Sequence, residues 1–270
     1  MKKTILTLLT AVFSFSTFAS CSNNEEVLVT KPQTYVFVHG AWQAPYVWDE
    51  VKNDLIKKGN QVVVVELPAH GADQTPAYTV SIESYRDKVI SEINKVEGKV
   101  ILVGHSMGGM VVTAVAESIP TKISKLVYIG AFVPESGQNL AELSMKDPNS
   151  KLGPFLSQSA DQLYLNVDVK ELTNLFIADG NAAAKQKVTE NYRPEPAIPF
   201  GSKVNWTKEH FGSVEKIYIK TLQDVVISPK FQEQMIASAA IKTVYSVNAS
   251  HSPFLSQPKA VSDLLLKIGN

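Results

Sequence analysis

The chain contains a single cysteine, Cys21, among its 270 residues. An intramolecular disulfide cannot form without a second cysteine, so the fold must be stabilised by its core. Lys plus Arg total 26, as do Asp plus Glu, which leaves no formal net charge. Nucleic acids and anionic membrane surfaces usually demand a basic excess, so we expect a small, mostly uncharged partner and no nucleic acid. No cluster of cysteines or carboxylates indicates a metal or an organic cofactor, and we expect neither.

A long membrane-spanning run is also missing. The uncharged apolar run of residues 5–18 is too short to cross a bilayer comfortably. It follows Lys2 and Lys3, and a basic flank before a short apolar run is typical of a secretory signal. The sequence therefore predicts a signal peptide over residues 1–20.

The end of this signal carries the only thiol of the chain. The segment Phe18-Ala19-Ser20-Cys21 resembles the lipobox of bacterial lipoproteins, although Phe18 replaces the usual aliphatic residue. The resemblance implies cleavage before Cys21 and lipidation of Cys21, hence an exported bacterial protein anchored to a membrane, periplasmic or at the cell surface, only through its lipid. The alternative is an ordinary signal cleaved nearby, with Cys21 incidental. Residues 21–31 are polar and acidic and predict a solvated tether.

The rest of the chain, residues 32–270, predicts a single α/β domain. Apolar runs of strand length, rich in Val and Ile, alternate with helical patterns, as expected for a parallel sheet covered on both faces. The predicted strands are residues 35–38, 62–65, 100–103, 126–129, 217–219 and 243–247.

Two further segments have a distinct organisation. Apolar residues from Ile82 to Val96 recur at spacings of three and four, which predicts an amphipathic helix capped by Ser81 and ended by Gly98. Residues 133–211 contain no convincing strand and are too long for a bare loop, so they predict an inserted helical cap. Helices are expected within the cap at residues 168–178 and 182–191. Aromatic residues that could line an apolar pocket there are Phe155, Tyr164, Phe176, Tyr192, Phe200 and Trp206.

Ser106 is the candidate nucleophile. It lies in Gly104-His105-Ser106-Met107-Gly108, directly after one predicted strand and before the helical run of residues 110–117. A nucleophile elbow turns so sharply from strand to helix that its neighbours must lack bulk, which Gly104 and Gly108 provide. A Gly-x-Ser-x-Gly pattern in this context predicts a serine hydrolase with an α/β-hydrolase fold.

A serine nucleophile needs a base, and an acid to orient that base. His251 follows the last predicted strand, at the carboxyl edge where such sheets place their chemistry, and it is the last of five histidines. Asp224 follows the preceding strand and is an isolated acid before Val225-Val226-Ile227. An oxyanion hole needs two backbone N–H groups, for which we predict Met107, after the nucleophile, and Ala41, after the first strand.

With these residues in place, the chain resembles the plant methyl esterase and hydroxynitrile lyase group of α/β-hydrolases. The resemblance extends over about residues 35–268 and is clearest at 37–41, 103–110, 211–214 and 228–232. It implies the same triad, Ser106, Asp224 and His251, with Ala41 and Met107 as oxyanion donors. The cap matches poorly, so the substrate does not carry over.

The two branches of that group differ at two positions. The lyases resemble one another in a threonine after the first-strand histidine and a lysine after the catalytic histidine, where this chain has Gly40 and Ser252. The resemblance therefore favours ester hydrolysis over cyanohydrin cleavage. With the balanced charge of the chain, we expect a small, largely apolar carboxylic ester as the substrate. A hydrolase-like small-molecule binding protein, and lyase or lactonase chemistry on the same triad, stay as alternatives.

Overall fold

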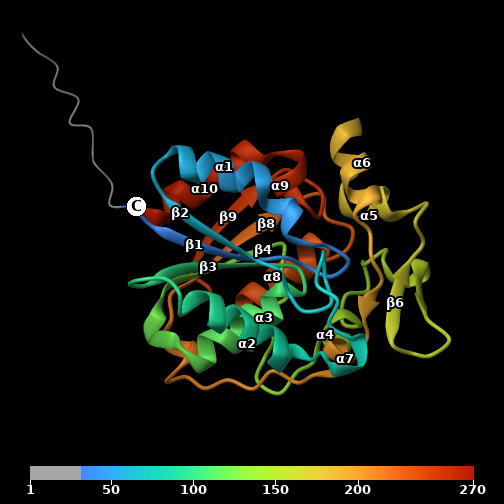
Figure 1. The fold of residues 1–270 in the computed structure, drawn as a ribbon, viewed down its shortest axis with the longest axis horizontal. Coiled ribbons are helices and arrows are strands. Elements are labelled where there is room, and N and C mark those ends of the chain that lie inside the picture. Colours follow the sequence, from blue (N-terminus) through green and yellow to red (C-terminus); the bar gives the residue numbers. More distant parts are fainter. Residues whose placement is uncertain (1–31) are drawn as a thin grey trace, which may run out of the picture. The chain divides into compact units, whose positions relative to one another are not determined.

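A six-stranded parallel sheet forms the centre of the molecule (Figure 1). The computed structural model describes residues 32–270. The predicted signal peptide, Cys21 and the tether lie outside these residues. All the predicted strands are confirmed. In sheet order they are β2 (Gln61–Val65), β1 (Thr34–Val38), β3 (Val100–His105), β4 (Ile123–Ile129), β8 (Lys216–Thr221) and β9 (Thr243–Val247).

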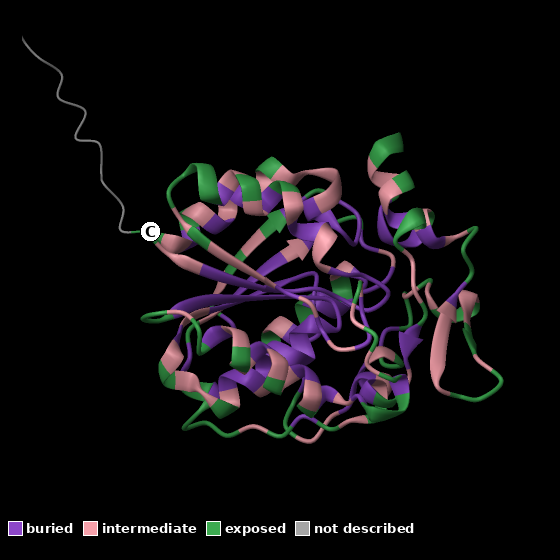
Figure 2. Ribbon diagram, in the orientation of Figure 1, coloured by how far each residue is buried: buried purple, intermediate pink, exposed green. Residues whose placement is uncertain are grey.

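Helices cover both faces of this sheet. Alternate residues of each strand point to opposite sides, and apolar side chains on both sides are buried beneath the helices. Tyr35 and Phe37 of β1 pack in the core beneath α1 (Asp49–Lys57) and α10 (Pro258–Gly269). Val36 and Val38 pack on the other side with α2 (Ile82–Ile93), α3 (Gly108–Ser118) and α8 (Pro229–Ser238). Figure 2 shows much of the sheet between these layers as buried, while the edge strands β2 and β9 keep partly exposed residues. Strands covered on both faces explain why the sequence shows continuous apolar runs.

Helix α2 begins where the sequence predicts and ends earlier. Ser81 is its N-cap, and the side chains of Ser81 and Ser84 bond each other's backbone N–H groups in a capping box. The helix ends at Ile93, so the expected continuation to Gly98 is wrong. The following residues form turns, and Gly98 adopts a left-handed φ of 78° before β3. Helix α3 starts at Gly108, within the nucleophile motif.

The segment between β4 and β8 is a mixed cap and not a purely helical one. It contains a three-stranded antiparallel sheet in the order β5-β6-β7, so the expectation of no strand is wrong. The predicted helix at 168–178 is confined to α5, whereas the helix at 182–191 is confirmed as α6, capped by Asn181. The cap elements are α4 (Leu140–Ser144), β5 (Leu156–Gln158), β6 (Tyr164–Val167), α5 (Leu172–Phe176), α6 (Ala182–Glu190), β7 (Glu195–Pro196) and α7 (Ile198–Gly201).

Short elements complete the fold. The helix α9 (Pro253–Ser256) precedes α10, and the 3-10 turns are Pro45–Trp48, Ala77–Thr79, Pro120–Lys122, Gly153–Phe155 and Phe211–Ser213.

Within residues 32–270, none of the helices has the length and apolar character needed to cross a membrane.

Candidate active site

Ser106 occupies a strained turn between β3 and α3. Its φ of 53° lies in the left-handed region, which residues other than glycine seldom adopt. The neighbouring glycines are required by space. A Cβ on Gly104 would lie 2.7 Å from Val112 and 2.8 Å from the Gly108 carbonyl oxygen, and one on Gly108 would lie 2.7 Å from the His39 carbonyl oxygen. Only glycine fits at these two positions, because the sharp strand-to-helix turn of a nucleophile elbow brings the neighbouring chain segments this close.

Asp224 and His251 meet in a buried pair. His251 Nδ1 donates to Asp224 Oδ2 at 2.8 Å, and both side chains are fully buried. The carboxylate also accepts the Thr221 hydroxyl at 2.8 Å and the N–H groups of Val226 at 2.8 Å and Ile227 at 2.9 Å. These donors stabilise the anion and fix its orientation. Because the Nδ1–H group donates a hydrogen bond to the Asp224 carboxylate, Nε2 of the neutral ring carries no hydrogen and can act as an acceptor.

His251 Nε2 is buried and has no hydrogen-bond partner within residues 32–270. The structure therefore joins Asp224 to His251 but shows no hydrogen bond from His251 to Ser106. Catalytic hydrogen bonds are often long before substrate binds. The arrangement leaves a free basic nitrogen beside the elbow.

Two other buried histidines support the site without acting as its base. His105 Nε2 donates to the His251 carbonyl oxygen at 2.9 Å, and burial together with the nearby His251 keeps its pKa well below the usual value. His39 contacts the Gly40 carbonyl oxygen through Nδ1 at 3.0 Å, and burial lowers its pKa to about 3. Both rings therefore stay neutral, and their role is to hold the loops of Gly40 and His251.

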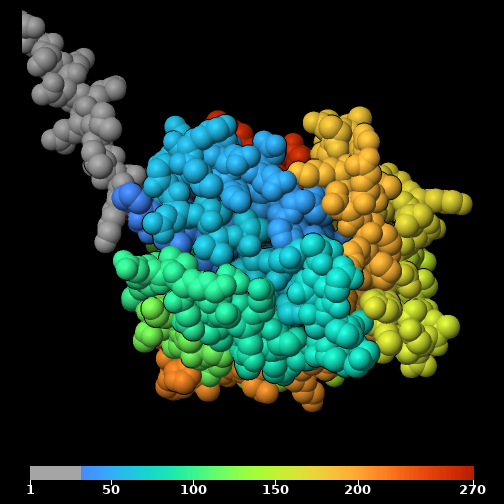
Figure 3. All heavy atoms as spheres, viewed as in Figure 1, coloured from blue at the N-terminus to red at the C-terminus, as the bar shows by residue number. Residues whose placement is uncertain are grey.

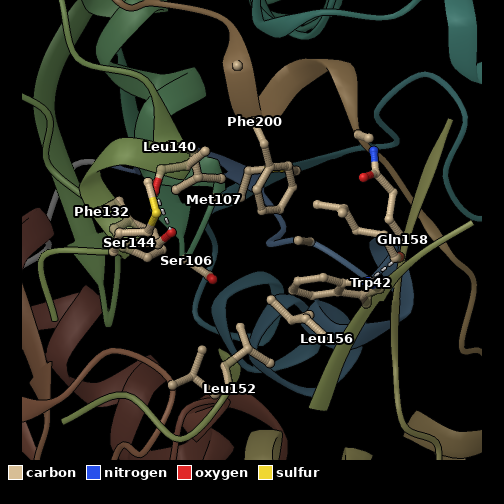
Figure 4. Close-up of a pocket in the computed structure, with 17 residues that line it drawn as sticks. Trp42, Ser106, Met107, Phe132, Leu140, Ser144, Leu152, Leu156, Gln158 and Phe200 are labelled. Atoms are coloured by element: carbon tan, nitrogen blue, oxygen red, sulfur yellow. Dashed lines mark hydrogen bonds between the residues drawn. The ribbon is translucent and has the colours of Figure 1, made fainter. Parts of the chain in front are cut away.

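A cavity of about 320 Å³ opens above Ser106. Figure 4 shows the Ser106 hydroxyl directed into it, between Phe132 on one side and Trp42 on the other. The expected oxyanion donors Ala41 and Met107 also line it, and no hydrogen bond within residues 32–270 uses either of their N–H groups. None of the side chains from residues 32–270 that line it is charged. The apolar walls come largely from the cap, including Leu140, Leu152, Leu156, Leu165 and Phe200.

Of the cap aromatics expected at the pocket, only Phe200 lines it. Phe176 packs edge-on against Trp42 and His251 at ring distances of 5.8 and 5.5 Å. Tyr192 accepts the Val167 N–H at 2.9 Å, and Trp206 Nε1 donates to Pro134 at 2.9 Å. Phe176 thus packs the cap against the core, whereas Tyr192 and Trp206 bond within the cap. The cavity residues that the sequence did not single out include four leucines, and a leucine at a cavity wall cannot be told from a core leucine in the sequence.

The geometry agrees with comparisons against known proteins. The model of the alpha/beta hydrolase family matches residues 35–264. The chain belongs to this family. Putative methylesterase 12, chloroplastic, from Arabidopsis thaliana is 29% identical over 267 residues, covering 92% of this chain and 76% of the relative. Methylesterase 3 from the same plant is 29% identical over 259 residues, covering 89% and 97%.

Solved structures show the same fold. This alpha/beta hydrolase superposes on the crystal structure of polyneuridine aldehyde esterase with a TM-score of 0.79 at 22% identity, over 89% of this chain and 100% of the other. The fold class and the resemblance to plant methyl esterases are confirmed by these findings.

Proposed function

We propose that this protein is a serine esterase that hydrolyses a small, largely apolar carboxylic ester. The observation that carries the proposal is the buried His251–Asp224 pair, in which His251 Nε2 has no hydrogen-bond partner within residues 32–270. Ser106, with its left-handed backbone conformation, lies nearby and lines the uncharged cavity. The similarity to curated methylesterases supports ester cleavage. The absence of charged lining residues favours a substrate without charge, since nothing there would replace the hydration of an ion.

The mechanism follows from the orientation of the groups. His251 Nε2 accepts the Ser106 proton as Oγ attacks the ester carbonyl carbon, and the resulting imidazolium is stabilised by Asp224. The N–H groups of Ala41 and Met107 hold the oxyanion. The intermediate collapses and expels the alcohol, which takes the proton from His251. Water, deprotonated by His251, then attacks the acyl-enzyme and releases the carboxylic acid.

Turnover of short-chain p-nitrophenyl esters tests the proposal. Wild type should release p-nitrophenol, and Ser106→Ala should abolish this release while leaving the melting temperature close to wild type. A neutral fluorophosphonate should label wild type at Ser106, which distinguishes an activated serine from a mere binding protein. Retained turnover in Ser106→Ala, or a wild type that is neither labelled nor active, would overturn the assignment.

Lyase chemistry is disfavoured because there is no room for a side chain at Gly40. A Cβ at that position would lie 2.7 Å from the Ser106 Cβ and 2.9 Å from His105 Nδ1, so the threonine seen in the lyases does not fit this backbone. Ser252 is buried, and its hydroxyl accepts from the neutral amide of Gln43 at 2.8 Å, so no cation is supplied there. Cyanide release from mandelonitrile faster than ester turnover would reverse this preference.

We also propose that the protein is exported and anchored through Cys21, on the sequence of residues 1–21 alone. Radiolabelled palmitate should then be incorporated by the full chain in a bacterial host, and Cys21→Ser should move the protein from the membrane fraction to the soluble fraction. Equal fractionation of the two proteins would exclude the anchor.

A further inference from the structure

A carboxylate of the cap lies against the oxyanion loop. Glu195, in β7, is fully buried, and its Oε2 accepts the backbone N–H of Trp42 at 2.8 Å. The same oxygen lies 2.8 Å from His70 Nε2. Trp42 directly follows Ala41, the expected oxyanion donor. One cap side chain therefore contacts the loop on which stabilisation of the transition state depends.

His70 is the counter-ion of this carboxylate. Its Nδ1 lies 3.0 Å from the Pro68 carbonyl oxygen and its Nε2 faces Glu195, so both ring nitrogens face acceptors and both need a proton. Burial alone would lower the pKa of His70, and the Glu195 carboxylate outweighs it and raises that pKa above its usual value. The His70–Glu195 contact is thus a buried ion pair between the core domain and the cap.

The loop residue held by this pair is strained. Trp42 has a φ of 57°, in the left-handed region that residues with a side chain rarely adopt. Both of its N–H groups are bonded to the cap, the backbone N–H to Glu195 and the indole N–H to the Leu165 carbonyl oxygen at 2.9 Å. Its ring packs against Phe176 and Phe200 at centroid distances of 5.8 and 5.9 Å. The cap therefore holds Trp42 in a geometry that the loop alone would not favour.

We propose that Glu195, neutralised by His70, is a positioning residue for the oxyanion hole. By fixing the peptide between Ala41 and Trp42, the cap sets the direction of the loop that carries the Ala41 N–H. It also engages the Trp42 N–H, which leaves Ala41 as the donor of this loop. The inference rests on the proposed esterase function, since it assigns Glu195 a part in the same reaction. Figure 3 shows the yellow and orange atoms of the cap next to the blue and cyan atoms of the core segments at the surface.

The chemistry of a carboxylate suits both partners at once. A single oxygen of Glu195 accepts from the Trp42 N–H and from an imidazolium, and its negative charge offsets the buried positive charge of His70. A glutamine amide oxygen could accept from Trp42 but could not neutralise His70. An alanine could do neither, and it would leave the Trp42 N–H without its acceptor.

The test compares Glu195→Gln and Glu195→Ala with Glu117→Ala. Glu117 of α3 accepts the N–H groups of Thr207 at 2.9 Å and Phe211 at 3.1 Å, so it also ties the segment following α7 to the core, but away from the oxyanion loop. For each variant, kcat and KM for a p-nitrophenyl ester and the inhibition constant of an alkyl trifluoromethyl ketone are measured, together with the melting temperature. The ketone forms an oxyanion with Ser106, whereas a non-reactive alcohol of similar shape measures cavity binding alone.

In Glu195→Ala, kcat should fall about 10- to 100-fold, because loss of an oxyanion donor itself costs about 10²–10³. KM and alcohol binding should change by less than about threefold, and ketone binding should weaken in parallel with kcat. Glu195→Gln, which retains an acceptor, should recover part of the loss, and Glu117→Ala should keep the wild-type kcat.

Three results would overturn the positioning role. They are an unchanged kcat in either folded Glu195 variant, an equal loss in Glu117→Ala, and equal weakening of ketone and alcohol binding. If Glu195→Ala does not fold, Glu195→Gln decides, and its kcat must fall while alcohol binding stays. An inactive, unlabelled wild type would instead refute the esterase function itself, which separates the two failures.

Discussion

The parallel sheet and the cap contribute to the site in different ways. The ends of β1, β3, β8 and β9 lead into the loops that carry Ala41, Ser106, Asp224 and His251. The cap supplies cavity walls and contributes no member of the proposed triad. The proposed reactive groups thus lie on loops at the ends of the strands, while the cap, the segment with the poorest sequence signal, surrounds them.

The cap nevertheless bonds to each of the flanking loops. Glu195 holds the oxyanion loop at Trp42. Asp147 accepts the Ser228 N–H and hydroxyl at 2.7 Å each, in the loop after Asp224. The Phe176 carbonyl oxygen accepts the Ser252 N–H at 2.9 Å, next to His251. The sheet therefore places the proposed catalytic groups, and the cap restrains three of the loops beside them.

The largest effect is expected for Asp224→Asn, in the core domain. The N–H groups of Val226 and Ile227 would keep the amide oxygen at the Oδ1 position, so the amide NH₂ would face His251 Nδ1. The ring would then carry its proton on Nε2 and could not accept the Ser106 proton, which lowers kcat by about 10⁴-fold. Steady-state kinetics on a p-nitrophenyl ester measure this loss. Asp161→Asn, at an exposed cap acid, should retain full activity; a loss below tenfold in Asp224→Asn would contradict the orientation role.

A smaller loss is expected for Asp147→Ala, in the cap. The buried Ser228 N–H would lose its acceptor, which costs about 1–3 kcal/mol. A domain of this size should then melt about 2–10 °C lower, and kcat should fall far less than in Asp224→Asn. Calorimetry and kinetics test both points. Asp168→Ala, at an exposed acid whose side chain accepts the Lys170 N–H, is the control. Equal melting of the two variants would show that the Asp147 contact does not restrain the loop.

The sequence predicts the sheet and the triad because both follow local rules. Strands covered on both faces must be continuously apolar, so their positions are visible without any tertiary information. Parallel strands end at one edge, which brings Asp224 and His251 together although 27 residues separate them. The motif likewise predicts the tight packing around its two glycines, because no larger residue would fit at Gly104 or Gly108.

The cap could not be predicted in the same way. Its strands are two to four residues long, too short to show an alternating pattern, and β7 contains a proline. The expected helix at 168–178 begins only at Leu172, because the Asp168 side chain accepts the Lys170 N–H in a turn. Glu195 looks like a surface acid in the sequence. Its burial depends on His70, which lies 125 residues away and is brought near only by the tertiary fold.

The His70–Glu195 pair gives the core–cap contact a pH dependence. The raised pKa of His70 means that the folded state binds a proton more tightly than the unfolded chain, so this stability is complete below the usual value of 6.5. It is lost as the pH rises through the folded pKa. The charged or titratable neighbours of His70 are Glu195, Arg193, His39 and Tyr85.

The measurement is the free energy of unfolding by urea at a series of pH values from 6 upward, compared with His70→Gln. Wild type should lose stability relative to the variant across this range, because only wild type carries the titrating ring. A difference that stays constant with pH, or that grows as the pH rises, would contradict an imidazolium at position 70.

The smallest effect is expected at an exposed contact between the same two regions. Lys187 of α6 lies 2.7 Å from Asp49 of α1, with side chains 37% and 49% exposed. Solvent screens such a pair and ordering two long side chains costs entropy, so Lys187→Ala should lower the free energy of unfolding by at most about 1 kcal/mol and leave kcat and KM unchanged. Urea unfolding at low and high salt checks this. If Lys187→Ala lowered kcat as much as Asp147→Ala, exposed and buried cap–core contacts would affect kcat equally. The buried hydrogen bonds at the loops would then have no specific role in restraining those loops.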